Sequence, residues 1–104
     1  MSVSELVEVA RVDEVPPGTV RMVLVGARSL VIANAGGEFY ALGGLCTHAH
    51  RPLAGAWLDG YHLVCPWHYA EFDLRTGEQV KWAYGGPLPT FPIKRVGDAL
   101  FVGV

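Results

Sequence analysis

The chain lacks the features of several common classes of protein. Charged residues make up only 17% of its 104 residues, the net charge is −2, and no run of lysine or arginine occurs. Nucleic acid and anionic membranes are therefore poor candidates as partners. No apolar stretch approaches the length of a membrane span. Residues 1–5 lack the basic start and apolar block of a secretory signal, so we expect a cytoplasmic protein.

Cysteine is scarce as well: Cys46 and Cys65 are the two in the sequence. A stable disulfide between them is not expected in a reducing cytoplasm, and a chain of this length folds without one. Each cysteine has a histidine close behind it, and this pattern suggests a metal site.

The hydrophobic content of 51% indicates a folded chain, and the length suits a single domain over residues 1–104. Short runs rich in valine, isoleucine and aromatic residues alternate with turn sequences, which predicts an all-β sandwich or barrel. Pro92 indicates an edge strand, and residues Pro52–Leu58 could form a short helical turn. The expected strands are Glu5–Val12, Val20–Val25, Ser29–Asn34, Glu38–Leu42, His62–Val64, Ala70–Leu74, Phe91–Val96 and Ala99–Val102.

Two segments, Gly43–Gly60 and Trp82–Pro89, are too long and too rich in glycine and proline to fit this scheme. Long irregular loops in a compact domain are usually functional. The first of them contains Cys46 and His48 and leads toward Cys65 and His68.

These four residues have the spacing of a metal centre: Cys46-Thr47-His48, then 16 residues, then Cys65-Pro66-Trp67-His68. Cysteine and histidine suit zinc or iron–sulfur chemistry. Zinc sites usually contain Cys-x₂₋₄-Cys or His-x₃₋₅-His, whereas each half here is mixed. Two cysteines on one iron and two histidines on the other would complete a two-iron cluster.

The two halves resemble the cluster-binding boxes of the Rieske family. Further similarity to its ferredoxin branch lies in residues 52–60 and 71–77, in Gly86-Pro87, which resembles the family's proline loop, and in residues 91–94. The resemblance covers roughly residues 39–102 and implies one [2Fe–2S] cluster. Cys46 and Cys65 would bind one iron, and His48 and His68 the other, nearer the surface. It also implies an antiparallel all-β fold with a small cluster-binding subdomain, about residues 43–88, inserted into a larger base.

The implied function is that of the ferredoxin component of aromatic-ring-hydroxylating dioxygenase systems. Such a protein carries single electrons from a flavin reductase to a terminal oxygenase and catalyses nothing itself. Two alternatives remain open: the small Rieske subunit of a nitrite-reductase-type enzyme, and a structural zinc-binding domain that uses the same four residues.

The resemblance also predicts a low reduction potential. Because the outer nitrogens of His48 and His68 would remain titratable, we further expect the reduction potential to depend on pH on the alkaline side. High-potential relatives carry a disulfide, a serine and a tyrosine beside the cluster, whereas this chain has Arg51 and Trp67, Ala70 and Phe72 at the corresponding positions. Fewer donors to sulfur leave the reduced state less stabilised. We therefore expect a value toward the low end of about −150 to +300 mV.

Two more residues lie near the expected centre. Tyr69 stands where the family usually has glycine, so it either adopts a strained backbone or marks a different loop, and it could contact a partner. His50 is interpreted as an exposed loop residue rather than a ligand.

Overall fold

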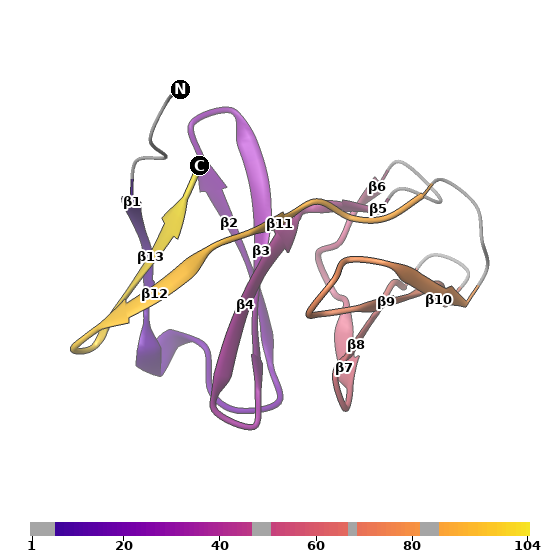
Figure 1. Cartoon of the computed structure of the whole chain (residues 1–104), viewed down its shortest axis with the longest axis horizontal. Helices are drawn as coiled ribbons and strands as arrows, with labels where there is room; N and C mark the ends of the chain where they lie inside the picture. The colour runs from indigo at the N-terminus through magenta and orange to yellow at the C-terminus, as the bar shows by residue number, and fades with distance from the viewer. Residues whose placement is uncertain (1–5, 47–50, 67–68, 82–85) are drawn as a thin grey trace.

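A computed structural model describes residues 6–46, 51–66, 69–81 and 86–104. In this part of the chain there is no α-helix, so no helix long and apolar enough to cross a membrane, and one 3₁₀ turn, η1 (Val12–Glu14). The strands, shown in Figure 1, are β1 (Leu6–Arg11), β2 (Val20–Val25), β3 (Arg28–Ala35), β4 (Glu38–Gly43), β5 (Leu45–Cys46), β6 (Arg51–Pro52), β7 (Trp57–Asp59), β8 (His62–Val64), β9 (Glu71–Asp73), β10 (Gln79–Lys81), β11 (Thr90–Phe91), β12 (Ile93–Val96) and β13 (Ala99–Gly103).

All strand pairings are antiparallel, which confirms the predicted fold class. Two sheets form the base of the molecule, with orders β1-β13-β12 and β11-β4-β3-β2. A third sheet, β10-β9-β8-β7, and the two-stranded β5-β6 form a smaller half, which lies to the right of the base in Figure 1.

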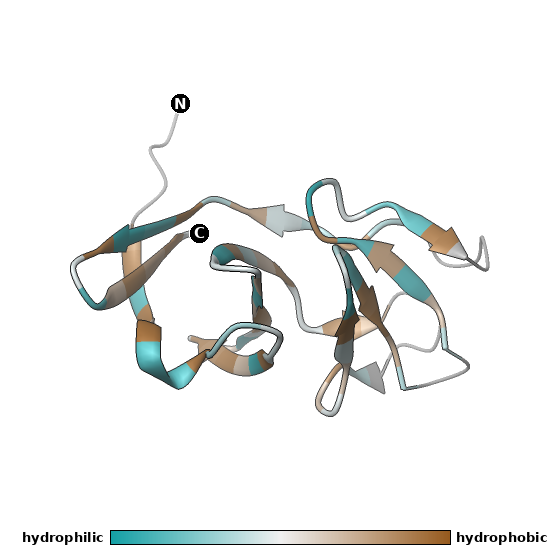
Figure 2. Cartoon of the chain, turned by 90° about the horizontal axis from the view of Figure 1, so that it is seen from below, coloured by the Kyte–Doolittle hydropathy of each residue, from teal (hydrophilic) through white to brown (hydrophobic). Residues whose placement is uncertain are grey.

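The strand β3 is buried on both faces. Val31 and Ala33 belong to a hydrophobic cluster that includes the smaller half, whereas Leu30 and Ile32 belong to a second cluster with β13. Successive side chains of a strand point to opposite faces, so β3 supplies both clusters at once. This explains why its sequence is almost continuously apolar. In Figure 2, brown segments accordingly lie on the strands of both halves.

The chain passes between the two halves twice, and the passages are joined to each other. The N–H of Gly43 donates to the carbonyl of Pro89 at 2.9 Å, and the N–H of Gly44 donates to that of Ser29 at 2.9 Å. A Cβ atom on Gly43 would lie 2.8 Å from Cγ of Pro89, and one on Gly44 would lie 2.8 Å from the Ser29 side chain. Only glycine allows these strands to approach so closely.

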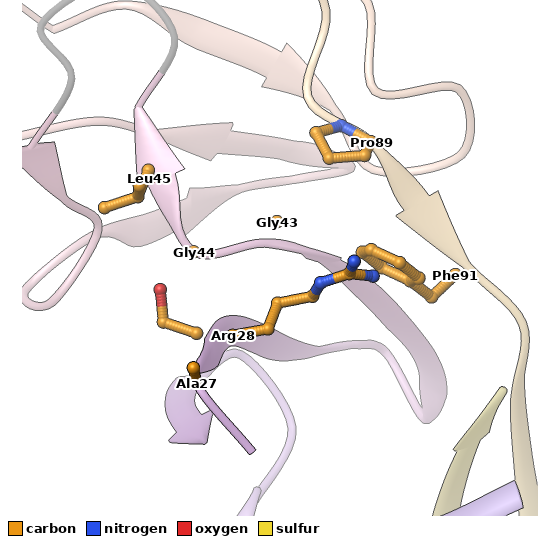
Figure 3. Close-up of a pocket in the computed structure, with 8 residues that line it drawn as sticks. Ala27, Arg28, Gly43, Gly44, Leu45, Pro89 and Phe91 are labelled. Carbon is orange, nitrogen blue, oxygen red and sulfur yellow. The ribbon is translucent and has the colours of Figure 1, made fainter. Parts of the chain in front are cut away.

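A groove of about 550 Å³ follows from this close approach (Figure 3). Gly43 and Gly44 have no side chains to fill it, and the exposed Leu45 borders it. The Arg28 guanidinium lies over the Phe91 ring, 5.5 Å from the ring centroid, so a cation–π contact forms one wall of the groove.

Most predicted strands are present, with ends shifted by one or two residues. The predicted helical turn at Pro52–Leu58 is wrong: β6 ends at Pro52, and β7 begins at Trp57, because residues 57–59 pair with β8. The predicted strand at Phe91–Val96 is divided at Pro92 into β11 and β12. Both pieces are edge strands, which confirms the interpretation of the proline.

Candidate metal centre

The first candidate loop begins at a buried cysteine. Leu45 pairs with Pro52 and Cys46 with Arg51, so β5 and β6 bring the two ends of residues 47–50 together. The N–H of Leu53 then donates to the carbonyl of Gly44 at 2.8 Å, which anchors the outgoing strand. Four residues, with His48 among them in the sequence, lie between the paired positions.

The second candidate loop has the same construction. The N–H of Cys65 donates to the carbonyl of Ala70 at 2.7 Å and closes a loop over residues 66–69. Each cysteine thus bonds or pairs with the residue five positions later, and His68 lies within the second loop in the sequence. The two halves of the sequence pattern therefore correspond to two loops of equal length.

Both cysteines have an exposed fraction of 0%, and no disulfide joins them, as the sequence led us to expect. They belong to the same hydrophobic cluster, together with Leu53, Ala70 and Leu88. A single buried cysteine is usually only a small apolar residue. Two of them at equivalent positions of two loops fit the predicted ligand pattern.

The histidines of the pattern, His48 and His68, lie outside the described residues, as do His50 and Trp67. The described chain therefore shows two of the four predicted ligands, and within it no group of three or more His, Cys, Asp or Glu side chains converges. His62 is described, and its Nδ1 lies 3.2 Å from Oε1 of Glu71, so this histidine is paired on the sheet. Two thiols and two imidazoles in two matched loops remain a donor set that fits a mixed-ligand two-iron cluster.

Ala70 and Phe72 are expected to stand where high-potential relatives carry a serine and a tyrosine. Both are fully buried, and Ala70, whose carbonyl accepts the N–H of Cys65, belongs to the same hydrophobic cluster as that cysteine. Neither side chain has a hydroxyl group to donate to sulfur. The low reduction potential stays a prediction.

Tyr69 has the strained backbone that its position in the sequence indicated. Its φ is +59°, and it is the one non-glycine residue with positive φ among those described. Its side chain is 64% exposed and meets Trp57 edge to face, with 6.1 Å between ring centroids. The sequence did not indicate Trp57, because the contact depends on the register of β7 with β8.

A second aromatic group ties the smaller half to the base. The hydroxyl of Tyr61 donates to Oε1 of Glu38 at 2.8 Å, and the Arg75 guanidinium lies 4.7 Å from the centroid of the Tyr61 ring. The hydrogen bond to Glu38, and then its negative charge, raise the pKa of Tyr61. Nearby, burial is the main cause of the raised pKa of Tyr40.

Comparisons with known proteins agree with this geometry. The family model described as "Rieske [2Fe-2S] domain" matches residues 5–92. The ferredoxin component of the p-cumate 2,3-dioxygenase system of Pseudomonas putida is 33% identical over 100% of this chain and 90% of its own length. The biphenyl dioxygenase ferredoxin subunit of Pseudomonas sp. (strain KKS102) is 38% identical over 88% of this chain and 84% of its own.

Solved structures give the same result. A complex of reduced oxygenase and oxidised ferredoxin in carbazole 1,9a-dioxygenase contains a chain with a TM-score of 0.86 and 31% identity, covering 94% of this chain and 92% of that one. The ferredoxin of carbazole 1,9a-dioxygenase from Nocardioides aromaticivorans IC177 has a TM-score of 0.88 and 26% identity, over 96% and 98%. The family match over most of the chain and the full-length similarity to these ferredoxins lead to one conclusion: this chain belongs to the Rieske [2Fe-2S] domain family.

Proposed function

We propose that the chain is a ferredoxin that holds one Rieske [2Fe–2S] cluster and carries single electrons from a flavin reductase to a terminal oxygenase. Cys46 and Cys65 bind one iron of the cluster, and His48 and His68 bind the other. When bound, the cluster supplies one-electron reduction and oxidation. The relatives are ferredoxin components of dioxygenase systems, which supports a role in electron transfer rather than catalysis.

The observation that carries this proposal is the pair of equivalent loops, each with a fully buried cysteine at its first position. The cysteines hold the inner side of the centre against the hydrophobic cluster and exclude water from it. The histidines follow two and three residues later, within the loops.

We further propose that residues 1–104 act as one domain, with a cluster-binding subdomain at about residues 43–88, and that the protein works in the cytoplasm. The hydrophobic cluster that contains both cysteines also contains Val31 and Leu42 of the base, which supports one folding unit. A reducing compartment is consistent with two cysteines that form no disulfide.

The test is to purify the protein anaerobically, to measure iron, sulfide and zinc, and to record the EPR spectrum after dithionite reduction. We expect two irons and two sulfides per chain, and a rhombic signal with an average g below that of clusters with four thiolates. Cys65→Ser and His68→Ala should lose this signal, whereas the matched control His62→Ala should keep it. Zinc without iron or sulfide would refute the proposal, and a signal that survives His68→Ala would refute the ligand assignment.

A further inference from the structure

The strain at Tyr69 has no evident structural benefit. A left-handed backbone brings Cβ of an L-residue against its own carbonyl oxygen, which is why the other positive-φ residues of the described chain are glycines. A buried side chain could offset such strain through packing, but the Tyr69 ring is 64% exposed. The strain is thus retained for a ring that faces solvent.

The ring also has an exposed aromatic neighbour. Trp57 is 43% exposed and meets Tyr69 at an interplanar angle of 65°. Tyrosine and tryptophan are enriched at protein–protein interfaces, because burial of their large apolar surface is stabilising. We call this pair the aromatic contact.

The aromatic contact lies beside the second cysteine loop. Tyr69 is within the loop closed by the Cys65–Ala70 hydrogen bond, and Trp57 pairs with Val64, the residue before Cys65. Trp57 is on β7, the edge strand of its sheet, so no further described strand covers that side. A protein that docks on the aromatic contact would reach the loop that carries His68.

We propose that Trp57 and Tyr69 are the docking contact for the terminal oxygenase, an inference that rests on the proposed function. Redox complexes bury little surface, so a few aromatic side chains provide much of their affinity. The occupant is the oxygenase because a ferredoxin of the same fold and 31% identity forms a complex with an oxygenase.

The test compares Tyr69→Gly and Trp57→Ala with the matched control Leu24→Ala, which removes a 74% exposed side chain from β2 in the base. Each cluster-loaded variant is titrated into turnover assays with a panel of terminal oxygenases from aromatic dioxygenase systems, that of carbazole 1,9a-dioxygenase included. The KM for the ferredoxin, its reduction potential and its thermal midpoint are measured.

We expect each aromatic variant to raise this KM about tenfold, which corresponds to about 1.4 kcal/mol of binding free energy. The reduction potential and the maximal rate should stay unchanged, and Leu24→Ala should match the parent. Tyr69→Gly should also raise the thermal midpoint because it removes the strain. A variant that is more stable but has a higher KM for the ferredoxin would show that Tyr69 acts in docking and not in stabilising the fold.

An unchanged KM in both aromatic variants would overturn the docking proposal and leave Tyr69 a tolerated surface residue. A loss confined to reduction by the flavin reductase would also overturn it, because the surface would then serve the electron donor. Failure of the parent protein to support turnover with any oxygenase of the panel would instead refute the proposed function, so the two failures are distinguishable.

Discussion

Gly77 is predicted to be irreplaceable because of where its missing side chain would lie. Its φ is +77°, and a Cβ atom built on it would overlap the carbonyl oxygen of Leu88. Its own carbonyl accepts the N–H of Leu88 at 2.8 Å, and its N–H donates to the carbonyl of Asp73 at 2.7 Å. Gly77 thereby joins the turn between β9 and β10 to the segment that returns to the base.

The expected effect of Gly77→Ala can be separated into three contributions. The left-handed backbone destabilises alanine by about 1–2 kcal/mol. Displacement of Leu88 loses a hydrogen bond worth about 0.5–1.5 kcal/mol. It also exposes part of a leucine side chain that is now 1% exposed, and full exposure costs about 1.5–3 kcal/mol.

Gly60→Ala is the matched control, since Gly60 has φ +61° in the same half of the molecule but no atom within 4 Å of an added Cβ. Both variants share the backbone strain and the change in unfolded-state entropy. With about half of the Leu88 side chain exposed, Gly77→Ala should therefore lower the free energy of unfolding by about 1–3 kcal/mol more than Gly60→Ala, from the two Leu88 contributions alone.

Urea unfolding followed by far-UV circular dichroism, at equal cluster content, measures this difference. Gly77→Ala should also lose its visible iron–sulfur absorbance faster on standing, because Leu88 packs in the cluster that contains both cysteines. Equal destabilisation by the two variants would show that the Leu88 contact contributes nothing and would refute this reasoning.

Three further predictions concern separate parts of the molecule. Ala70→Ser adds a hydroxyl group next to Cys65 and should raise the reduction potential by about 20–60 mV, which corresponds to a hydrogen bond of about 0.5–1.5 kcal/mol in a one-electron couple. Voltammetry measures the potential, and an unchanged value would mean that the side chain at position 70 does not reach the cluster. Because the folded-state pKa of Tyr61 is raised, its contribution to stability is present below the unfolded pKa of 10.0 and is lost as pH rises through the folded pKa. Glu38→Gln should lower the pKa of Tyr61, read from tyrosinate absorbance, and an unchanged titration would contradict the hydrogen bond. Asn34→Ala should destabilise the base by about 1–3 kcal/mol in thermal unfolding, because the buried amide of Asn34 donates to the carbonyl of Val15 at 2.8 Å. An unchanged stability would mean that a water molecule takes the place of the amide in the variant.

Sequence patterns predicted the strands whose register is set locally. Val20–Val25 and His62–Val64 have the predicted bounds, because turn residues flank short β-branched runs at these places. The two-residue strands β5 and β6 were not predicted, since they exist only as the paired ends of a loop. Leu24 alternates with Val20 and Met22, yet it is 74% exposed. Alternation identifies a face, but the length of the covering layer decides whether its last residue is buried.

The candidate site was predictable to the extent that its residues are close in sequence. Cys46 and Cys65 were identified by the spacing to their histidines, and Tyr69 by its replacement of glycine. Trp57 and the Glu38–Tyr61 hydrogen bond were missed, because each joins residues whose proximity depends on the pairing of separate strands. The sequence likewise does not distinguish Glu71 and Asp73 from ordinary surface acids. Their side chains are only 13% and 22% exposed, and Glu71 pairs with His62 and Asp73 with Arg75.

The placement of the cysteines links the proposed cluster site to the stability of the whole fold. One hydrophobic cluster contains Cys46 and Cys65, Phe72 and Leu88 of the smaller half, and Val31 of the base. A smaller half of this size has too little apolar surface to fold alone. It depends on the face that β3 presents to it, and the thiols lie within that shared interior. A substitution such as Val31→Ala, far from either cysteine loop in sequence, should therefore lower both the stability of the chain and its retention of the cluster. Leu30→Ala, on the opposite face of β3, should destabilise the chain with less effect on retention of the cluster.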